Sequence, residues 1–422
     1  MNEMIALQTD TQLLNGKIIL QVIPNLETGG AERTTVDMVG GIVRAGGRAL
    51  VASAGGRLVG AVEAAGGQHV TLPLDAKFRL DRLWRCRQSL IALARTSRVD
   101  LIHARSRAPA FAALSAANAA GIPFMTTYHG IYSENNALKR WYNSVMVKGV
   151  AVIANSNYTA DIIRARYGTE EARLFVVHRG TDLALFDRTR IAPSARNALQ
   201  ARLKLPKGRP IVMLVARLTE WKGHLLAVKA AAMLKADVEA EAGIMPFFVF
   251  AGQAQSETFA ARIRSDIVEA GLLNDVMLTG HIDDVPLVLS LADIVIVPST
   301  KPEAFGRSVA EASAMEVPVI AFDHGGAVET IACPPAVDAG NRTGFRVANG
   351  DVAALAAAIR RLADMPSDAR RAIGQRGRQH IANHFSTEQM VQKTIAVYNH
   401  VLSRSHKQNG ISVDFGTKGV NL

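Results

Sequence analysis

Short, continuous apolar runs alternate with alanine-rich segments along nearly all of this 422-residue chain, and the alternation limits the folds it can adopt. Most runs are apolar throughout, as expected of parallel strands buried on both faces. Seven lie in the first half, at residues 17–23, 48–53, 69–72, 100–103, 124–128, 150–154 and 174–177. Five lie in the second half, at residues 211–216, 247–251, 276–279, 294–298 and 317–322. The spacing, about 25 to 35 residues, predicts an α/β protein with two Rossmann-like, doubly wound parallel-sheet domains facing a central cleft.

A polar stretch at residues 187–210 separates the two sets of runs. We therefore expect one domain over residues 16–188 and another over residues 209–384. A helix is predicted at residues 387–402, and the polar, glycine-containing tail at residues 405–422 is expected to be disordered.

The bulk composition is that of a soluble globular protein, with 49% hydrophobic and 20% charged residues. No apolar run approaches the roughly 20 residues of a membrane-spanning helix. The first residues lack the basic start and apolar middle of a secretory signal. The two cysteines, Cys86 and Cys333, have no partner at metal-ligand spacing, so we expect a cytoplasmic protein.

The net charge of +11 favours anionic partners. Residues 77–98 carry seven lysines and arginines against one aspartate, interspersed with apolar residues, which is typical of a basic amphipathic helix. One interpretation is an ordinary surface helix, with its basic residues in solvent and its apolar residues in the core. The alternative is that the helix docks peripherally on the inner, anionic face of the cytoplasmic membrane. Residues 139–142, which combine two basic with two aromatic side chains, slightly favour docking.

Arg217 and Lys222 follow the apolar run at residues 211–216. Two fixed cations at the end of a strand suit a diphosphate, although a surface charge pair is the alternative.

Glu303 and Glu311 are separated by seven residues and follow the run at residues 294–298. A glutamate that faces a ribose can accept hydrogen bonds from both hydroxyls. Phe305 and Gly306, between them, suggest a loop whose backbone amides touch a ligand. The alternatives are a helix-capping acid for Glu303 and a solvated helix acid for Glu311. Taken with the two cations, these residues fit a nucleotide-sugar donor and hence a glycosyltransferase.

Two weaker signals lie in the first half. Gly29 and Gly30 stand between a strand and a helix, where free amides and the helix dipole favour a phosphate, but a plain turn is the alternative. His129 stands at the end of the run at residues 124–128, where α/β proteins bind ligands, or it is structural.

A metal ion is not expected. The chain has no D-x-D sequence, and the adjacent Asp283 and Asp284 would point in different directions. Arg217 and Lys222 would then neutralise the leaving diphosphate themselves.

Together these motifs resemble the retaining glycosyltransferases of the GT-B fold, family GT4, over residues 17–402. The segments that carry the resemblance are Gly29–Gly30, His129, Arg217 with Lys222-Gly223, and Glu303 with Glu311.

The resemblance implies roles for matching positions in the second, nucleotide-sugar-binding domain. Arg217 and Lys222 would hold the donor diphosphate, and Glu311 would bind the ribose. Glu303 would contact the transferred sugar, with help from the backbone of Phe305 and Gly306. Catalysis would retain the anomeric configuration, with the leaving phosphate assisting as base.

In the first, acceptor-binding domain, His129 would touch the sugar near its 6-hydroxyl, and Gly29–Gly30 would lie near the distal phosphate and the acceptor. The helix at residues 387–402 would cross back to this domain. Relatives usually carry Asn-Gly where this chain has Arg179-Gly180, after His178, so the contact of that asparagine is in doubt.

Further segments resemble bacterial enzymes that build the lipopolysaccharide core, namely residues 106–110, 128–130 and 142–146. The resemblance implies a lipopolysaccharide core or another lipid-linked glycan as acceptor. GDP-mannose is the first choice of donor, and UDP-sugars and ADP-heptose stay open. The alternatives are a sugar-nucleotide epimerase of the same architecture and a basic, non-enzymatic nucleic-acid-binding protein. Nucleic acid is not the expected partner, because aromatic residues make up only 5% of the chain.

Overall fold

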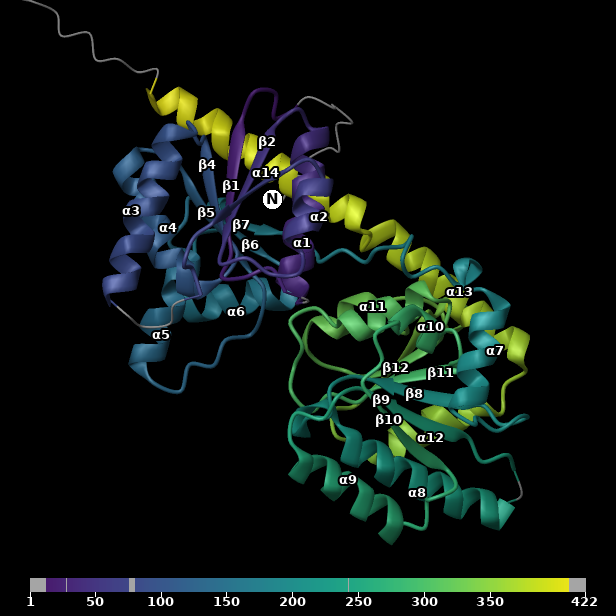
Figure 1. The fold of residues 1–422 in the computed structure, drawn as a ribbon. Helices are drawn as coiled ribbons and strands as arrows, with labels where there is room; N and C mark the ends of the chain where they lie inside the picture. Colours follow the sequence, from purple (N-terminus) through teal and green to yellow (C-terminus); the bar gives the residue numbers. More distant parts are fainter. Residues whose placement is uncertain (1–12, 28, 76–79, 242, 410–422) are drawn as a thin grey trace, which may run out of the picture. The chain divides into compact units, whose positions relative to one another are not determined.

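The computed structural model of the protein describes residues 13–27, 29–75, 80–241 and 243–409. Contacts within the chain divide it into two compact units, which are coloured along the sequence in Figure 1. The first unit takes in Met1–Asn155, Ala160–Val177 and Met390–Leu422. The second unit takes in Ser156–Thr159 and His178–Gln389.

The first unit contains a sheet of seven strands in the order β3-β2-β1-β4-β5-β6-β7, and every neighbouring pair is parallel. Its strands are β1 (Ile18–Val22), β2 (Arg48–Ser53), β3 (Gln68–Thr71), β4 (Leu101–Ala104), β5 (Phe124–Tyr128), β6 (Ala151–Ala154) and β7 (Leu174–Val176). The helices along this part of the chain are α1 (Gly30–Arg44), α2 (Val59–Ala64), α3 (Leu80–Thr96), α4 (Arg107–Ala120), α5 (Ala137–Ser144) and α6 (Asn157–Tyr167), with α14 (Thr387–Asn409) at the end of the chain.

Strand β1 shows why its sequence is apolar throughout. Ile18 and Leu20 point into a core that they share with side chains of α3 and α4. Ile19, between them, points to the other face, where it joins side chains of α1 and α14. Both faces of the strand are therefore buried, as in other parallel sheets that are covered by helices on each side.

The second unit contains a parallel sheet of six strands in the order β10-β9-β8-β11-β12-β13. Its strands are β8 (Ile211–Val215), β9 (Phe247–Ala251), β10 (Val276–Gly280), β11 (Ile294–Val297), β12 (Val319–Phe322) and β13 (Gly344–Val347). Its helices are α7 (Pro193–Arg202), α8 (His224–Glu241), α9 (Glu257–Glu269), α10 (Val285–Leu289), α11 (Arg307–Ala314), α12 (Val352–Ala363) and α13 (Ser367–His384).

Strand β8 repeats the arrangement of β1. Val212 and Leu214 pack with residues of α8 and α12, whereas Ile211 and Met213 pack with residues of α11 on the other face. In both units the chain order of the strands reverses at a point next to the first strand, namely between β1 and β4 and between β8 and β11. Ligands of open α/β sheets bind at such switch points, beyond the carboxyl ends of the strands. The prediction of two doubly wound parallel sheets is confirmed.

Three details differ from the predictions. Strand β13 was missed, because it is a short strand at the sheet edge that begins with Gly344 and includes Arg346. Helix α14 was predicted to end at residue 402, but it continues to Asn409. The expected tail at residues 405–422 therefore begins as helix, and residues 410–422 lie outside the described part of the chain.

The change between the units also comes earlier than predicted. The first domain was expected to reach residue 188, but the second unit takes over at His178, directly after β7. Thr181 then pairs with Ser386 in a short parallel bridge, which ties the following segment to the second unit. Within the described residues, no helix combines the length and apolar character that a bilayer span requires.

Candidate active site

Lys222 and Glu303 form the centre of the candidate site in the second unit. Lys222 ends the short 3-10 helix η4 (Glu220–Lys222) that follows β8, and Glu303 lies in the loop between β11 and α11. The Lys222 Nζ lies 2.7 Å from Oε1 of Glu303, and only 15% and 12% of the two side chains is exposed. The structure therefore joins two residues for which the resemblance implies separate roles, one for a diphosphate and one for a sugar.

Gly223 allows these two loops to meet. Its φ of +79° is in the left-handed region, and a Cβ at this position would lie 1.8 Å from the carbonyl oxygen of Pro298. The amide of Thr300 also donates a hydrogen bond of 2.8 Å to the carbonyl oxygen of Trp221. Glycine is required here because any side chain would clash with the backbone that precedes Glu303.

Ser299 and His324 hold Glu303 in place. The Ser299 hydroxyl donates to Glu303 Oε1 over 2.6 Å, so this oxygen accepts from both Ser299 and Lys222. The His324 Nε2 lies 2.6 Å from the Ser299 carbonyl oxygen. Among the described residues, Oε2 of Glu303 has no hydrogen-bond partner, so it can accept from a ligand hydroxyl. No role was predicted for Ser299 or His324, although each comes two residues after the end of a strand.

Glu311 lies on α11 and is held by a residue one turn earlier. The Arg307 Nε and Nη2 donate to Oε1 of Glu311 over 3.1 and 2.6 Å. Half of the Arg307 side chain is exposed, compared with 15% of the Glu311 side chain. The Ser308 hydroxyl donates to the carbonyl oxygen of Val215 over 3.3 Å, which places the start of α11 at the end of β8. No role was predicted for Arg307.

Gly306 and Phe305 lead into α11. Gly306 is the N-cap residue with a φ of +86°, and a Cβ there would lie 2.7 Å from the Cα of Ala327. The Phe305 ring is buried in the core and lies 5.7 Å from the ring of Phe385. A ligand could therefore meet only the backbone of this segment, at a helix N-terminus whose first amides have no partner within the helix.

Arg217 is the exposed cation of the site. It follows β8 by two residues, and it makes no hydrogen bond or ion pair with any described residue. Its guanidinium is thus available to an anion, whereas the Lys222 ammonium is already shared with Glu303.

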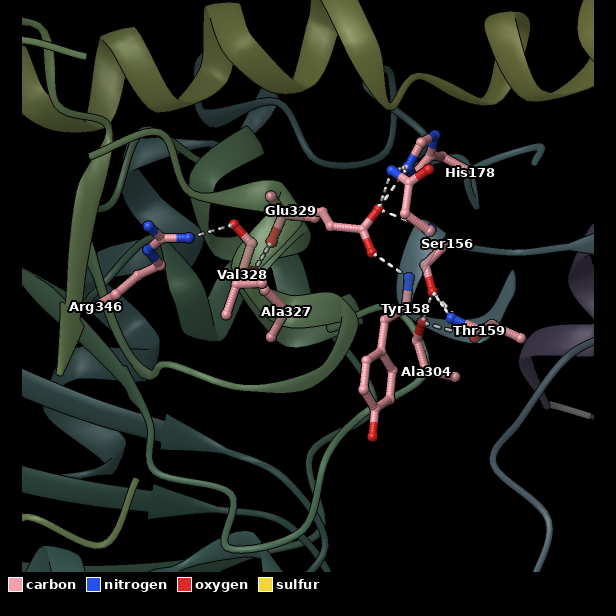
Figure 2. Close-up of polar contacts among 11 residues, drawn as sticks. Ser156, Tyr158, Thr159, His178, Ala304, Ala327, Val328, Glu329 and Arg346 are labelled. Atoms are coloured by element: carbon pink, nitrogen blue, oxygen red, sulfur yellow. Dashed lines mark hydrogen bonds and ion pairs between the residues drawn. The ribbon is translucent and has the colours of Figure 1, made fainter. Parts of the chain in front are cut away.

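A second network, drawn in Figure 2, supports the loop that carries Glu303. The Ser156 hydroxyl donates to the carbonyl oxygen of Ala304 over 2.5 Å. The Glu329 carboxylate accepts from the amides of Asn157 and Tyr158 over 2.9 and 2.8 Å, and it lies 2.7 Å from the His178 Nε2. Desolvation raises the pKa of Glu329, but the hydrogen bonds from His178 and the two amides outweigh it and lower the pKa below its ordinary value.

His178 directly precedes Arg179, the position at which relatives usually carry the asparagine. The structure gives the histidine a structural partner in Glu329. The backbone of Gly180 packs closely against Thr387, with no room for a Cβ.

The remaining predicted residues lie in the first unit. Gly29 is the N-cap residue of α1, and Gly30 is the first residue of that helix. His129 directly follows β5, and its carbonyl oxygen accepts a hydrogen bond of 3.2 Å from the Asn155 side chain. The described residues contain no group of three histidine, cysteine or acidic side chains that could hold a metal ion.

Comparison with known proteins agrees with this architecture. The family described as "Glycosyl transferases group 1" matches residues 195–380, and "Glycosyltransferase Family 4" matches residues 28–185. The chain is similar to D-inositol 3-phosphate glycosyltransferase 1 of Catenulispora acidiphila, with 27% identity over 71% of this chain and 72% of that protein.

Solved structures show the same likeness. A glycosyltransferase from Rickettsia africae is 30% identical, with a TM-score of 0.81, over 92% of this chain and 99% of that one. HepE of Anabaena, solved with UDP and glucose, is 22% identical with a TM-score of 0.75, over 91% of this chain and all of that one (100%). At that identity HepE shows the fold alone. These findings give no support to the epimerase or the nucleic-acid-binding alternative. The chain belongs to the group 1, family 4 glycosyltransferases of the GT-B fold.

Proposed function

We propose that the enzyme transfers a hexose from a nucleoside diphosphate sugar to a lipid-linked glycan, with retention of the anomeric configuration and without a metal ion. The observation that carries the proposal is the cluster of Lys222, Ser299 and Glu303 at the carboxyl edge of the second sheet. The Lys222 ammonium lies next to the Glu303 carboxylate, whose Oε2 has no hydrogen-bond partner among the described residues, and this arrangement supports a site for a phosphate beside a sugar hydroxyl.

The donor would bind along the start of α11. Arg217 and Lys222 would neutralise the diphosphate, and the backbone of Phe305 and Gly306 would help Glu303 to contact the transferred sugar. Glu311 would accept from the ribose hydroxyls, since Arg307 occupies only its Oε1. The roles of Gly29, Gly30 and His129 stay the predictions that the resemblance gives.

In the transfer step, the bond between the anomeric carbon and the distal phosphate oxygen breaks, and a bond to an acceptor hydroxyl forms on the same face. The acceptor proton passes to the leaving phosphate oxygen, so no protein nucleophile is required. Arg217 and Lys222 stabilise the charge that develops on the diphosphate, which is the main contribution that fixed cations make to such a step.

Fewer observations support the identity of the donor nucleotide and of the acceptor. GDP-mannose is the first choice of donor, and the fold is shared with HepE, which was solved with UDP and glucose. We propose an anionic acceptor such as a lipopolysaccharide core. The relative from Catenulispora is named for D-inositol 3-phosphate, a small phosphorylated polyol.

Peripheral binding to an anionic membrane is part of the proposal, but the basic segment supports it only in part. Residues 76–79 lie outside the described part of the chain. The Arg87 side chain donates a hydrogen bond to the Ser115 hydroxyl, so part of its binding capacity is used within the protein. The stronger support is the exposure of Trp84 (62%) and Trp141 (58%), since tryptophan favours membrane interfaces. Replacing both with serine should weaken binding to anionic vesicles. Equal binding by the variant would contradict this part.

A thermal-shift screen against GDP, UDP, ADP and their sugar conjugates, in the presence of EDTA, tests the donor site. A selective shift with one base supports the site and identifies the donor class. If no nucleotide shifts the melting temperature at millimolar concentration, the donor assignment is wrong. A shift that appears only after Mg²⁺ or Mn²⁺ is added would contradict the metal-independent reaction.

A further inference from the structure

Arg107, in the first unit, has the chemistry of a binding residue and no role in the donor site. It follows β4 and is the first residue of α4, so it lies at the carboxyl edge of the sheet, where ligands of α/β folds bind. Its guanidinium carbon lies 4.0 Å from the centre of the Tyr132 ring and 5.6 Å from that of Tyr142. Two loops that are distant in sequence, after β4 and after β5, therefore meet at this cation.

The guanidinium is fixed but not neutralised. The Arg107 Nη1 donates to the Asn143 side-chain oxygen over 2.8 Å, and Asn143 is only 1% exposed. Asn143 is itself fixed, because its Nδ2 donates to the carbonyl oxygen of Ser133 over 3.1 Å. No carboxylate among the described residues forms an ion pair with Arg107. Glu134, from the segment between β5 and α5, accepts a hydrogen bond from the Tyr167 hydroxyl and lies 3.9 Å from the Arg166 Nη1.

Most of the hydrogen-bonding capacity of Arg107 remains available. A guanidinium has five N–H groups, and only one is used by Asn143. None of the Arg107 nitrogens is both buried and unpaired, so the other N–H groups reach solvent. If the residue at position 107 only had to join the two loops, a neutral glutamine could make the same hydrogen bond. An arginine held between aromatic rings can in addition bind a phosphate or carboxylate through two parallel hydrogen bonds.

Tyr128 supplies a second, independent observation. Its side chain is fully buried, and its hydroxyl makes no hydrogen bond with a described residue. The ring lies 4.4 Å from the Tyr132 ring that carries Arg107. Buried hydroxyls normally have a partner, so an unpaired one on the ring that packs against Tyr132 indicates a place where a ligand supplies polar groups.

We propose that Arg107 binds the anionic group of the sugar acceptor, so that the enzyme selects acceptors that carry a phosphate. This inference rests on the proposed function and gives the acceptor a chemical class. Tyr132 and Tyr142 flank the guanidinium, and Asn143 fixes its orientation, so little side-chain freedom is lost when the anion binds.

The test compares three probes that differ in charge: D-inositol 3-phosphate, uncharged inositol and inorganic phosphate. Calorimetric binding is measured with the wild-type protein and with Arg107→Gln, Arg107→Lys and Arg95→Gln. Arg95→Gln is the matched control, because Arg95 is another arginine of the first unit that donates only to a backbone carbonyl, that of Ala119.

The wild-type protein should bind D-inositol 3-phosphate more tightly than inorganic phosphate and should not bind inositol. Arg107→Gln should lose about tenfold or more in affinity for the phosphorylated probe, Arg107→Lys should lose less, and Arg95→Gln should be unchanged. Equal affinity of the wild type for the charged and uncharged probes, unchanged affinity in Arg107→Gln, or no binding of the phosphorylated probe by the wild type would each overturn the proposal.

The nucleotide thermal shift separates this proposal from the proposed function. All four proteins should show the same shift, because Arg107 lies outside the donor site. A normal shift with no effect of Arg107→Gln on the phosphorylated probe contradicts only the acceptor proposal. Absence of a shift in the wild type contradicts the donor site itself.

Discussion

Lys222 and Glu303 are 81 residues apart in the sequence, and their charged atoms lie 2.7 Å apart. An ammonium with three donors can keep this contact and still bind a phosphate oxygen. The pair thus orients the lysine before the donor arrives, and it leaves one oxygen of Glu303 for the sugar. Preorganised charges of this kind need no rearrangement during the reaction.

Replacing Lys222 with alanine should therefore impair both donor binding and turnover. We expect kcat/KM to fall by about 10²- to 10³-fold, as is typical when one group that stabilises developing charge is removed. Steady-state kinetics with the donor identified by thermal shift would measure this. Lys229→Ala is the control, because Lys229 is an exposed lysine on α8. Kinetics of Lys222→Ala that equal those of the control would exclude the proposed role.

Ser299→Ala should separate sugar positioning from nucleotide binding. The variant loses the 2.6 Å hydrogen bond to Glu303 Oε1 but keeps the Lys222 contact. We expect kcat to fall severalfold, roughly the effect of losing one hydrogen bond of about 1 kcal/mol. The affinity for free nucleoside diphosphate should not change, since Ser299 touches neither the cations nor Glu311. An equal loss of nucleotide affinity would show a general disturbance of the loop instead.

Glu311→Ala should weaken binding of the nucleotide itself. The loss should appear with the free nucleoside diphosphate as well as with the sugar conjugate, by about tenfold for a charge-assisted hydrogen bond. Arg307→Gln removes the partner and keeps the carboxylate. Because the Arg307 side chain is half exposed, this pair adds little stability, and the melting temperature should stay nearly constant. If only the sugar conjugate binds more weakly to Glu311→Ala, the ribose role is wrong.

The sequence predicted the strands well because their apolar runs are long enough to identify a buried parallel sheet. It also placed Arg217, Lys222, Glu303 and Glu311 correctly at the ends of strands or on the helix that follows. It could not predict the Lys222–Glu303 contact, because nothing in either segment specifies which strands are neighbours. The structure supplies this, since β8 pairs directly with β11.

Residues that act through another residue were the hardest to predict. Ser299 and Asn143 resemble many other polar residues in loops, and their importance depends on which charged group they contact. The edge strand β13 was missed for a related reason: its short, partly polar sequence needs the hydrogen bonds of β12 to be a strand.

Tyr398 and His103 should contribute to the stability of the first unit. The Tyr398 hydroxyl lies 2.7 Å from Nδ1 of His103, and both side chains are fully buried. Tyr398→Phe would leave that ring nitrogen without the hydroxyl, so we expect a loss of about 1–3 kcal/mol in the free energy of unfolding. Denaturant unfolding measures it. A free energy of unfolding equal to that of the wild type would contradict the role of this contact.

His224 should make the stability of the second unit depend on pH. The side chain is fully buried, and its ring packs edge-to-face with Phe250 at 5.5 Å. The pKa of His224 is lowered from 6.5 to about 4, mainly because burial removes the ring from water; the backbone of Thr219 opposes this shift, and the nearby Lys222 ammonium adds to it.

The sign of the effect follows from the two pKa values. Between pH 6.5 and about 4, the unfolded chain binds a proton at His224 that the folded chain does not bind, so acidification favours unfolding. The stability present above pH 6.5 should decrease by about 3 kcal/mol as the pH falls to about 4. His224→Phe should remove this part of the dependence, whereas replacing the exposed His281 with glutamine should keep it. Melting temperatures measured from pH 7 to pH 4 would show the difference. A variant with the same slope as the wild type would mean that His224 is protonated in the folded state.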